Sequence, residues 1–97
     1  MVSLYHSEQA TPCPDLFNLA AYVLNAGDET PAKTALEIID ADGSVETWTF
    51  RALTQAIRGT ATGLLSLGLK PQDRVLMRLG NTIDFPITFL AAISVGL

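Results

Sequence analysis

Apolar residues recur every three or four positions in two segments of the chain, which is the spacing of an amphipathic helix. The first segment covers residues 15–25, DLFNLAAYVLN, with Asp15 as its predicted N-cap and Gly27 just beyond its end as a stop. The second covers residues 49–68, TFRALTQAIRGTATGLLSLG, with Thr49 as its N-cap. Each segment therefore predicts a helix that packs one apolar stripe against a neighbouring surface.

Two glycines interrupt the second predicted helix. Gly59 and Gly63 each cost roughly 1 kcal/mol relative to alanine in a helix interior. We therefore expect them where this helix closely approaches another backbone. The same four-residue spacing pairs helices in membranes, but Arg51, Gln55 and Arg58 lie on this segment and exclude that interpretation.

Alternation of bulky and polar residues between these helices predicts an antiparallel hairpin. Its strands are residues 34–40, TALEIID, and residues 45–50, VETWTF, with Asp42 and Gly43 as the turn signal. Asp40 and Asp42 could suggest a metal site. Acidic residues at a turn usually serve the turn itself, and no other ligand-type side chain clusters near them, so we interpret them as turn residues.

The end of the chain predicts a buried strand followed by an apolar helix. Residues 73–79, DRVLMRL, are rich in apolar residues, and a Gly-Asn-Thr break separates them from a segment with no charge after Asp84. With Asp84 as N-cap, Pro86 takes the second helical position, where its missing N–H leaves no bond unmade. The pair is half of a βαβ unit, and the sequence stops at Leu97, where the returning strand would follow. We expect these residues to be a piece of a larger protein.

The junction between this strand and helix is also a candidate anion site, because helix N-termini at the ends of parallel strands bind phosphates. Residues 80–82 contain one glycine, however, and neither the GxGxxG nor the GxxxxGK[ST] pattern is present. Asp84 would also repel a phosphate placed there. We interpret the junction as a structural turn.

Three single residues were weighed as functional groups. Cys13 and His6, the only cysteine and histidine, both lie in residues 1–14, an extended leader without the apolar run of a signal peptide. A catalytic thiol needs a base or a positive field, and nothing in the sequence orients His6 for that role. Tyr22 is predicted to be a partly buried structural residue rather than a ligand contact. One cysteine excludes an internal disulfide and fits a reducing cytosol.

The composition indicates too little polar surface for so short a chain. Hydrophobic residues make up 48% and charged residues 16%, against roughly 25% charged in an ordinary soluble domain. Part of the apolar surface should therefore pack against the rest of a larger protein. The 97-residue chain by itself should self-associate. The net charge of −4, with six scattered basic residues, argues against nucleic acid or an anionic membrane as a partner. Residues 85–97 are uncharged but are too few for a membrane span of about 20 residues.

Several runs of sequence, taken in this order, resemble one known family. They are FNLAAYVL at 17–24, WTF at 48–50, GLKPQDRV at 68–75, NTIDFP at 81–86 and FLAAISVG at 89–96. From residue 17 to residue 97 the chain resembles the N-terminal start of the adenylate-forming enzymes, the acyl-CoA synthetase group. Within that group, residues 17–24, RVLM and TIDFP are most similar to benzoate-type and other aryl or acyl acid CoA ligases.

The resemblance implies an α/β fold in which residues 15–97 are an incomplete N-terminal segment of the AMP-binding domain, with a hairpin, one strand of a larger sheet and three helices. It implies a cytoplasmic parent enzyme that uses ATP, Mg²⁺ and CoA to convert a small carboxylic acid, through an acyl adenylate, into its CoA thioester. The family's phosphate loop, nucleotide pocket and catalytic lysine would all lie beyond Leu97. We therefore expect no catalytic, cofactor-binding or metal-binding residue here, and an inactive fragment. The alternative is a non-catalytic binding or assembly module that uses the apolar last helix as its interaction face.

Overall fold

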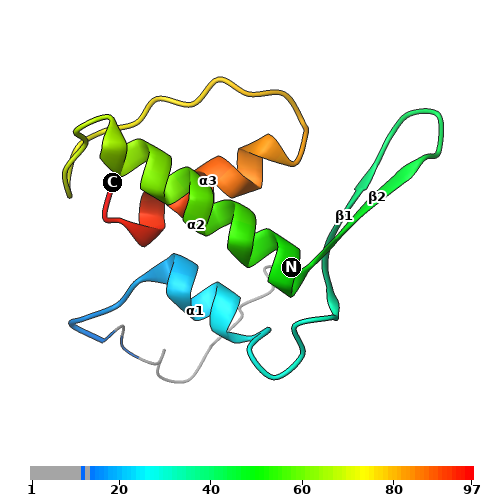
Figure 1. Ribbon diagram of the computed structural model, residues 1–97, viewed down its shortest axis with the longest axis horizontal. Helices are drawn as coiled ribbons and strands as arrows, with labels where there is room; N and C mark the ends of the chain where they lie inside the picture. The colour runs from blue at the N-terminus through cyan, green and yellow to red at the C-terminus, as the bar shows by residue number, and fades with distance from the viewer. Residues whose placement is uncertain (1–11, 13) are drawn as a thin grey trace, which may run out of the picture.

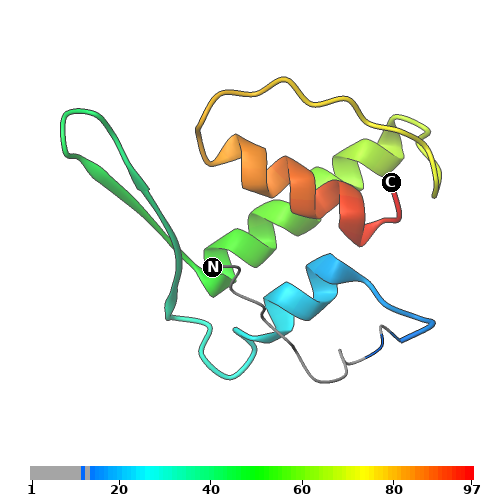
Figure 2. The ribbon, with the colours of Figure 1, turned by 180° about the vertical axis from the view of Figure 1, so that it is seen from behind.

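The computed structural model describes residue 12 and residues 14–97, and it confirms an α/β chain with three helices and a two-stranded antiparallel sheet. In chain order the elements are α1 (Leu19–Asn25), β1 (Thr34–Ile39), β2 (Val45–Thr49), α2 (Phe50–Ser66) and α3 (Asp84–Ser94). Figures 1 and 2 show the three helices gathered in one body, with the β1–β2 hairpin projecting from it beside the start of α2. The predicted leader, residues 1–14, lies almost entirely outside the described residues.

A small apolar cluster between α2 and α3 forms the core. Its buried members are Leu53, Ile57, Ala61, Ile87 and Ala91. The three from α2 recur every four residues and so share one side of the helix, as the sequence predicted. The predicted N-cap is also present, because the Thr49 hydroxyl accepts a hydrogen bond from the Ala52 N–H at 3.2 Å. Burial of this stripe against α3 therefore fixes the packing of α2.

Helix α1 is shorter than the sequence predicted, since Asp15 is not its cap. Asn18 takes that position, with an extended backbone and a side-chain Oδ1 that accepts from the Ala21 N–H at 3.1 Å. The Asn18 Nδ2 also donates to the carbonyl of Ile93 near the end of α3, at 2.9 Å. A tertiary contact 75 residues away along the chain thus determines where α1 begins, and local sequence did not reveal it.

The hairpin follows its prediction closely. Ile39 lies opposite Val45 and Glu37 opposite Thr47 in the antiparallel register, with an irregularity between Thr34 and Leu36. At the turn, the Asp40 N–H donates to the Ser44 carbonyl at 2.9 Å. Gly43 supplies the positive φ of 86° that the turn requires.

The strand predicted for residues 73–79 is not formed, which is the main departure from the sequence prediction. Residues 73–79 form neither helix nor strand. No hydrogen bond joins the backbone of residues 74–81 to any described residue. Its burial still alternates, with Val75 and Met77 half-buried and Leu76 97% exposed. A strand needs a neighbouring strand to satisfy its N–H and C=O groups. Among the described residues, no strand pairs with residues 73–79.

Helix α3 begins at Asp84, one residue earlier than expected, because the prediction made Asp84 the cap rather than the first helical residue. Ile83 is the cap and makes no side-chain capping bond, so Pro86 occupies the third helical position rather than the second. Both positions lie in the first turn, where a missing N–H costs nothing. One side of α3 contributes Ile87, Ala91 and Ala92 to the core, whereas its other side is left half-exposed.

The helical glycines do not serve the purpose that we expected. A Cβ added at Gly59 or Gly63 would meet nothing within 4 Å, so neither marks a close backbone approach among the described residues. The close approach occurs at Gly27 instead. A Cβ there would overlap the ring and Cβ of Phe50, so glycine is needed where the chain leaving α1 passes the start of α2.

Candidate functional site

The carboxylates of Asp40 and Asp42 hold the hairpin turn together. The Ser44 N–H donates to Asp42 Oδ1 at 2.9 Å, and the Ser44 hydroxyl lies 2.7 Å from Asp42 Oδ1 and 3.1 Å from Asp40 Oδ2. These bonds favour the charged carboxylate, and the bond from the Ser44 side chain lowers the pKa of Asp42 most, followed by the bond from its backbone. No group of three or more metal-ligand side chains occurs in the part of the chain that the structure describes. The geometry is that of turn residues.

Of the three single residues weighed from the sequence, the structure describes Tyr22. Cys13 and His6 lie outside the described residues. Tyr22 is 67% exposed, so the prediction of a partly buried tyrosine is wrong. Its ring lies against that of Phe17, with the centroids 5.4 Å apart. The exposure of Tyr22 follows from the shortness of α1, in which Ala20 is the one buried residue.

The junction before α3 carries an acidic group where an anion would have to bind. Asp84 is the first residue of α3 and lies in its first turn. A carboxylate at that position already interacts favourably with the positive end of the helix dipole. It would also oppose a phosphate brought to the same N–H groups, which supports the structural interpretation of residues 80–82.

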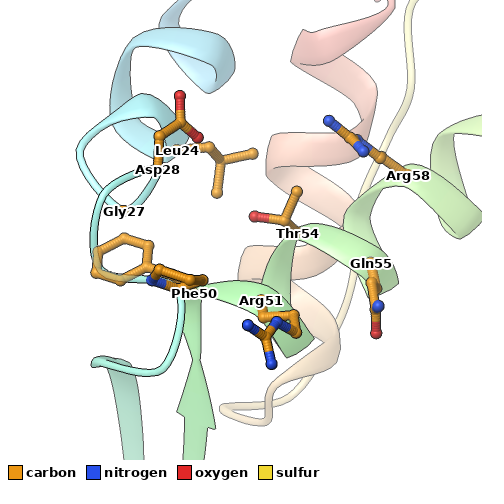
Figure 3. A pocket seen from close by; sticks show the side chains of 9 residues that line it. Leu24, Gly27, Asp28, Phe50, Arg51, Thr54, Gln55 and Arg58 are labelled. Atoms are coloured by element: carbon orange, nitrogen blue, oxygen red, sulfur yellow. The ribbon is translucent and has the colours of Figure 1, made fainter.

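A hollow of about 220 Å³ opens between α1, the following loop and the first turns of α2 (Figure 3). Its walls are Leu24, Gly27, Asp28, Pro31, Phe50, Arg51, Thr54, Gln55 and Arg58. Two backbone hydrogen bonds tie the loop to the helix start, from the Phe50 N–H to the Lys33 carbonyl and from the Arg51 N–H to the Pro31 carbonyl, each 3.0 Å long. Sequence reasoning missed this hollow, although Gly27 was noted as a helix stop.

The chemistry available in this hollow is limited. Arg51, Gln55 and Arg58 recur at helical spacing on the exposed side of α2, which is the ordinary solvated face of an amphipathic helix. Figure 3 shows Thr54 between the two arginines and Asp28 across the hollow. The lining residues include hydrogen-bonding groups and charges but no cysteine or histidine. They could contact an anion, but they do not form a nucleophile with an adjacent base.

Comparison with known protein families shows which family the chain belongs to. The sequence model of one family, described as AMP-binding enzyme, matches residues 24–97. The chain belongs to the AMP-binding enzyme family. This confirms the resemblance drawn from the sequence runs, and the matched residues include the hairpin, α2 and α3.

Two curated relatives of this AMP-binding family member are ligases or synthetases by name. It is 30% identical over 79 residues to a vibriobactin-specific 2,3-dihydroxybenzoate-AMP ligase of Vibrio cholerae, covering 81% of this chain and 14% of that protein. It is 43% identical over 54 residues to an acetyl-coenzyme A synthetase of Methanothrix thermoacetophila, covering 56% of this chain and 8% of that one. The chain therefore spans a small part of the relatives that it matches.

Two solved structures share the fold of this family member. The crystal structure of CmiS6 superposes with a TM-score of 0.75 at 37% identity, over 91% of this chain and 21% of that one. A benzoate CoA ligase from Burkholderia xenovorans superposes with a TM-score of 0.70 at 34% identity, over 84% of this chain and 16% of that one. The benzoate-type similarity seen in the sequence is thus present in the structure. None of the described helices is both long and apolar enough to cross a membrane.

Proposed function

We propose that residues 1–97 are the N-terminal part of an ATP-dependent carboxylic acid–CoA ligase, and that residues 15–97 begin its AMP-binding domain. The observation that carries the proposal is the match to the AMP-binding family across residues 24–97. The likeness to a benzoate CoA ligase at 34% identity and to an acetyl-coenzyme A synthetase at 43% identity supports CoA as the second substrate. The parent protein is proposed to be cytoplasmic and to act on a small carboxylic acid.

The proposed reaction has two steps. The carboxylate attacks ATP and forms an acyl adenylate, with pyrophosphate as the leaving group. The CoA thiol then attacks the acyl carbon, and AMP departs with the bonding electrons. Mg²⁺, when bound by the parent enzyme, would offset the charge of the phosphates in the first step. The residues described here contribute the packed scaffold of α2 and α3 to this reaction and supply no reacting group.

The test uses the polypeptide in which residues 1–97 are followed by the rest of their coding sequence. We expect pyrophosphate to exchange into ATP only when an acid is present, across a panel of aromatic, short and long carboxylic acids. Thioester formation on addition of CoA then separates a CoA ligase from an AMP ligase. Absence of exchange with every acid would remove the ligase proposal, and exchange without thioester formation would remove the CoA step.

The 97-residue chain by itself is proposed to be inactive. Purified chain incubated with ATP, Mg²⁺, CoA and the best acid from the panel should release no AMP above the level of a protein-free reaction. Formation of a CoA thioester by the isolated chain would contradict this and would place reacting groups among these residues.

A second candidate function is a free-standing binding or assembly module. The specific observation in its favour is the pair Phe85 and Phe89 on α3, which are 44% and 42% exposed and have stacked rings with centroids 6.5 Å apart. Sequencing the gene downstream of codon 97 separates the two functions. A stop codon there favours the module, whereas a continuation into a Ser/Thr/Gly-rich phosphate loop favours the ligase.

A further inference from the structure

The outer end of the β1–β2 hairpin combines acidic side chains with exposed apolar ones. Residues 34–49 contain four acidic residues and no basic residue. Next to the turn, Ile39 lies opposite Val45, and these side chains are 69% and 54% exposed. Figures 1 and 2 both show the hairpin standing away from the three helices. This end therefore offers negative charge and apolar surface to another molecule.

The hollow between α1 and α2 has the complementary character. Its α2 wall carries Arg51 and Arg58, which are seven residues apart and so lie on the same side of the helix, roughly 10 Å apart along its axis. Both are exposed, and neither side chain makes a hydrogen bond or an ion pair with a described residue. Leu24 and Phe50 add apolar surface, and Asp28 is the one acid among the lining residues. The hollow therefore suits a partner that carries both negative charge and apolar side chains.

The hairpin points away from the hollow of its own chain. Strand β2 ends at Thr49 and α2 begins at Phe50, so the base of the hairpin lies beside the hollow (Figure 3). The turn is then a strand length away, about 20 Å for six residues. Two hairpins that lie side by side in opposite directions place each turn at the base of the other, and hence at the hollow of the other chain. One two-fold axis therefore makes both contacts at once.

We propose that two copies of this chain form a symmetric dimer in which the outer end of each hairpin docks in the α1–α2 hollow of the other copy. Arg51 and Arg58 then face the exposed carboxylates of Glu37, Asp40 and Glu46. Exposed ion pairs of this kind are individually weak and are screened by salt, so the dimer should be weak and salt-sensitive. The proposal concerns assembly and goes beyond the ligase activity.

Variants with exchanged charges test the proposal. The first variant, Arg51→Glu with Arg58→Glu, makes the hollow acidic. The second variant, Glu37→Lys with Asp40→Lys and Glu46→Lys, makes the hairpin basic. Each variant by itself brings like charges together and should be monomeric. An equal mixture should form a mixed dimer, because both contacts then join opposite charges.

The measurement is sedimentation equilibrium, with circular dichroism to check that each variant folds. Every protein carries Phe85→Gln, so that the exposed pair Phe85 and Phe89 on α3 does not contribute to association. The second variant keeps Asp42, which holds the turn through its bonds with Ser44. Without the charge exchanges, the Kd of the dimer should rise by about tenfold or more between about 50 mM and about 500 mM NaCl.

The matched control is Arg74→Glu with Arg78→Glu, which makes the same change in net charge at two exposed arginines outside the hollow. This control should dimerise by itself, unlike the first variant. Mixed with the second variant, it matches one of the two contacts and should form fewer mixed dimers than the first variant does. A general attraction between oppositely charged chains would give equal amounts in the two mixtures.

A spin label locates the contact without any change of charge at the interface. The nitroxide is attached through Ala41→Cys in a chain that also carries Cys13→Ser. In a second, ¹⁵N-labelled copy it should broaden the amide signals of residues 51–58.

Four results would overturn the proposal. They are a monomer at every concentration up to about 1 mM, well above the Kd of a specific dimer, no mixed dimer from the exchanged variants, equal loss of dimer in the first variant and the arginine control, and broadening by the label that spares residues 51–58.

Discussion

Asn18 links the first helix to the last through a single side chain. Its Oδ1 caps α1 and its Nδ2 donates to the Ile93 carbonyl. Asn18→Ala should therefore lower the free energy of unfolding by about 1–2 kcal/mol, since a cap and a tertiary hydrogen bond are lost together. Urea unfolding followed by circular dichroism measures the change. Asn25→Ala is the control, because Asn25 is exposed at the other end of α1. Equal effects of the two variants would contradict the linking role.

Gly27 is required by packing, whereas Gly59 is not. An alanine Cβ at residue 27 would overlap Phe50, so Gly27→Ala should lower the free energy of unfolding by about 1–3 kcal/mol. Gly59→Ala places its Cβ in open space within α2 and should raise the free energy of unfolding by up to about 1 kcal/mol. Thermal unfolding of both variants beside the parent chain provides the measurement. Stabilisation by Gly27→Ala would disprove the close approach.

The Asp42 carboxylate gives the hairpin turn a dependence on pH. Its pKa is lowered in the folded chain by hydrogen bonds from Ser44. A folded pKa below the unfolded one means that this stabilisation is complete above the unfolded pKa and is lost as pH falls through the folded pKa. Ser44→Ala should raise the pKa of Asp42 toward its ordinary value, as read from an NMR titration of the side-chain carboxyl carbon. Ser66→Ala, which removes a hydroxyl bonded to the Thr62 carbonyl, should leave it unchanged.

At the scale of whole elements, the sequence predicted a helix or strand correctly where residues within the element were sufficient to specify it. Helix α2 has a side-chain cap, a clear apolar stripe and a glycine stop, and it forms as predicted. The hairpin has alternation and an Asp-Gly turn, and its two strands pair as predicted. The helical bonds of α2 and the ladder bonds of the hairpin each join residues close together in the sequence. For that reason neither needed information from distant residues.

The sequence prediction failed where a feature depends on contacts with residues far away along the chain. The start of α1 moved from Asp15 to Asn18 because Asn18 also contacts the end of α3. Residues 73–79 have apolar strand residues, yet the ladder that would make them a strand requires a neighbour. The hollow beside Phe50 was missed for the same reason, since residues before β1 and after β2 meet there.

At the scale of the whole molecule, the Phe85 and Phe89 rings leave apolar surface exposed on α3. We infer that the 97-residue chain self-associates through the stacked pair Phe85 and Phe89. Phe85→Gln should shift the chain toward monomer in static light scattering over a dilution series, because it removes exposed apolar area at the contact. Phe17→Gln is the matched control, since Phe17 is 45% exposed and Phe85 is 44% exposed. A monodisperse parent monomer, or equal effects of both variants, would contradict this.

The sequence by itself determined the family, the α2 helix and the hairpin. These follow from side-chain periodicity, capping residues and family-specific runs, which act over short stretches of chain. Tertiary structure decided the start of α1, the close contact of Gly27 with Phe50, the open surroundings of Gly59 and Gly63, and the return of Gly96 to Gln72. Each of these depends on which distant groups meet, and packing of α2 against α3 brings those groups together.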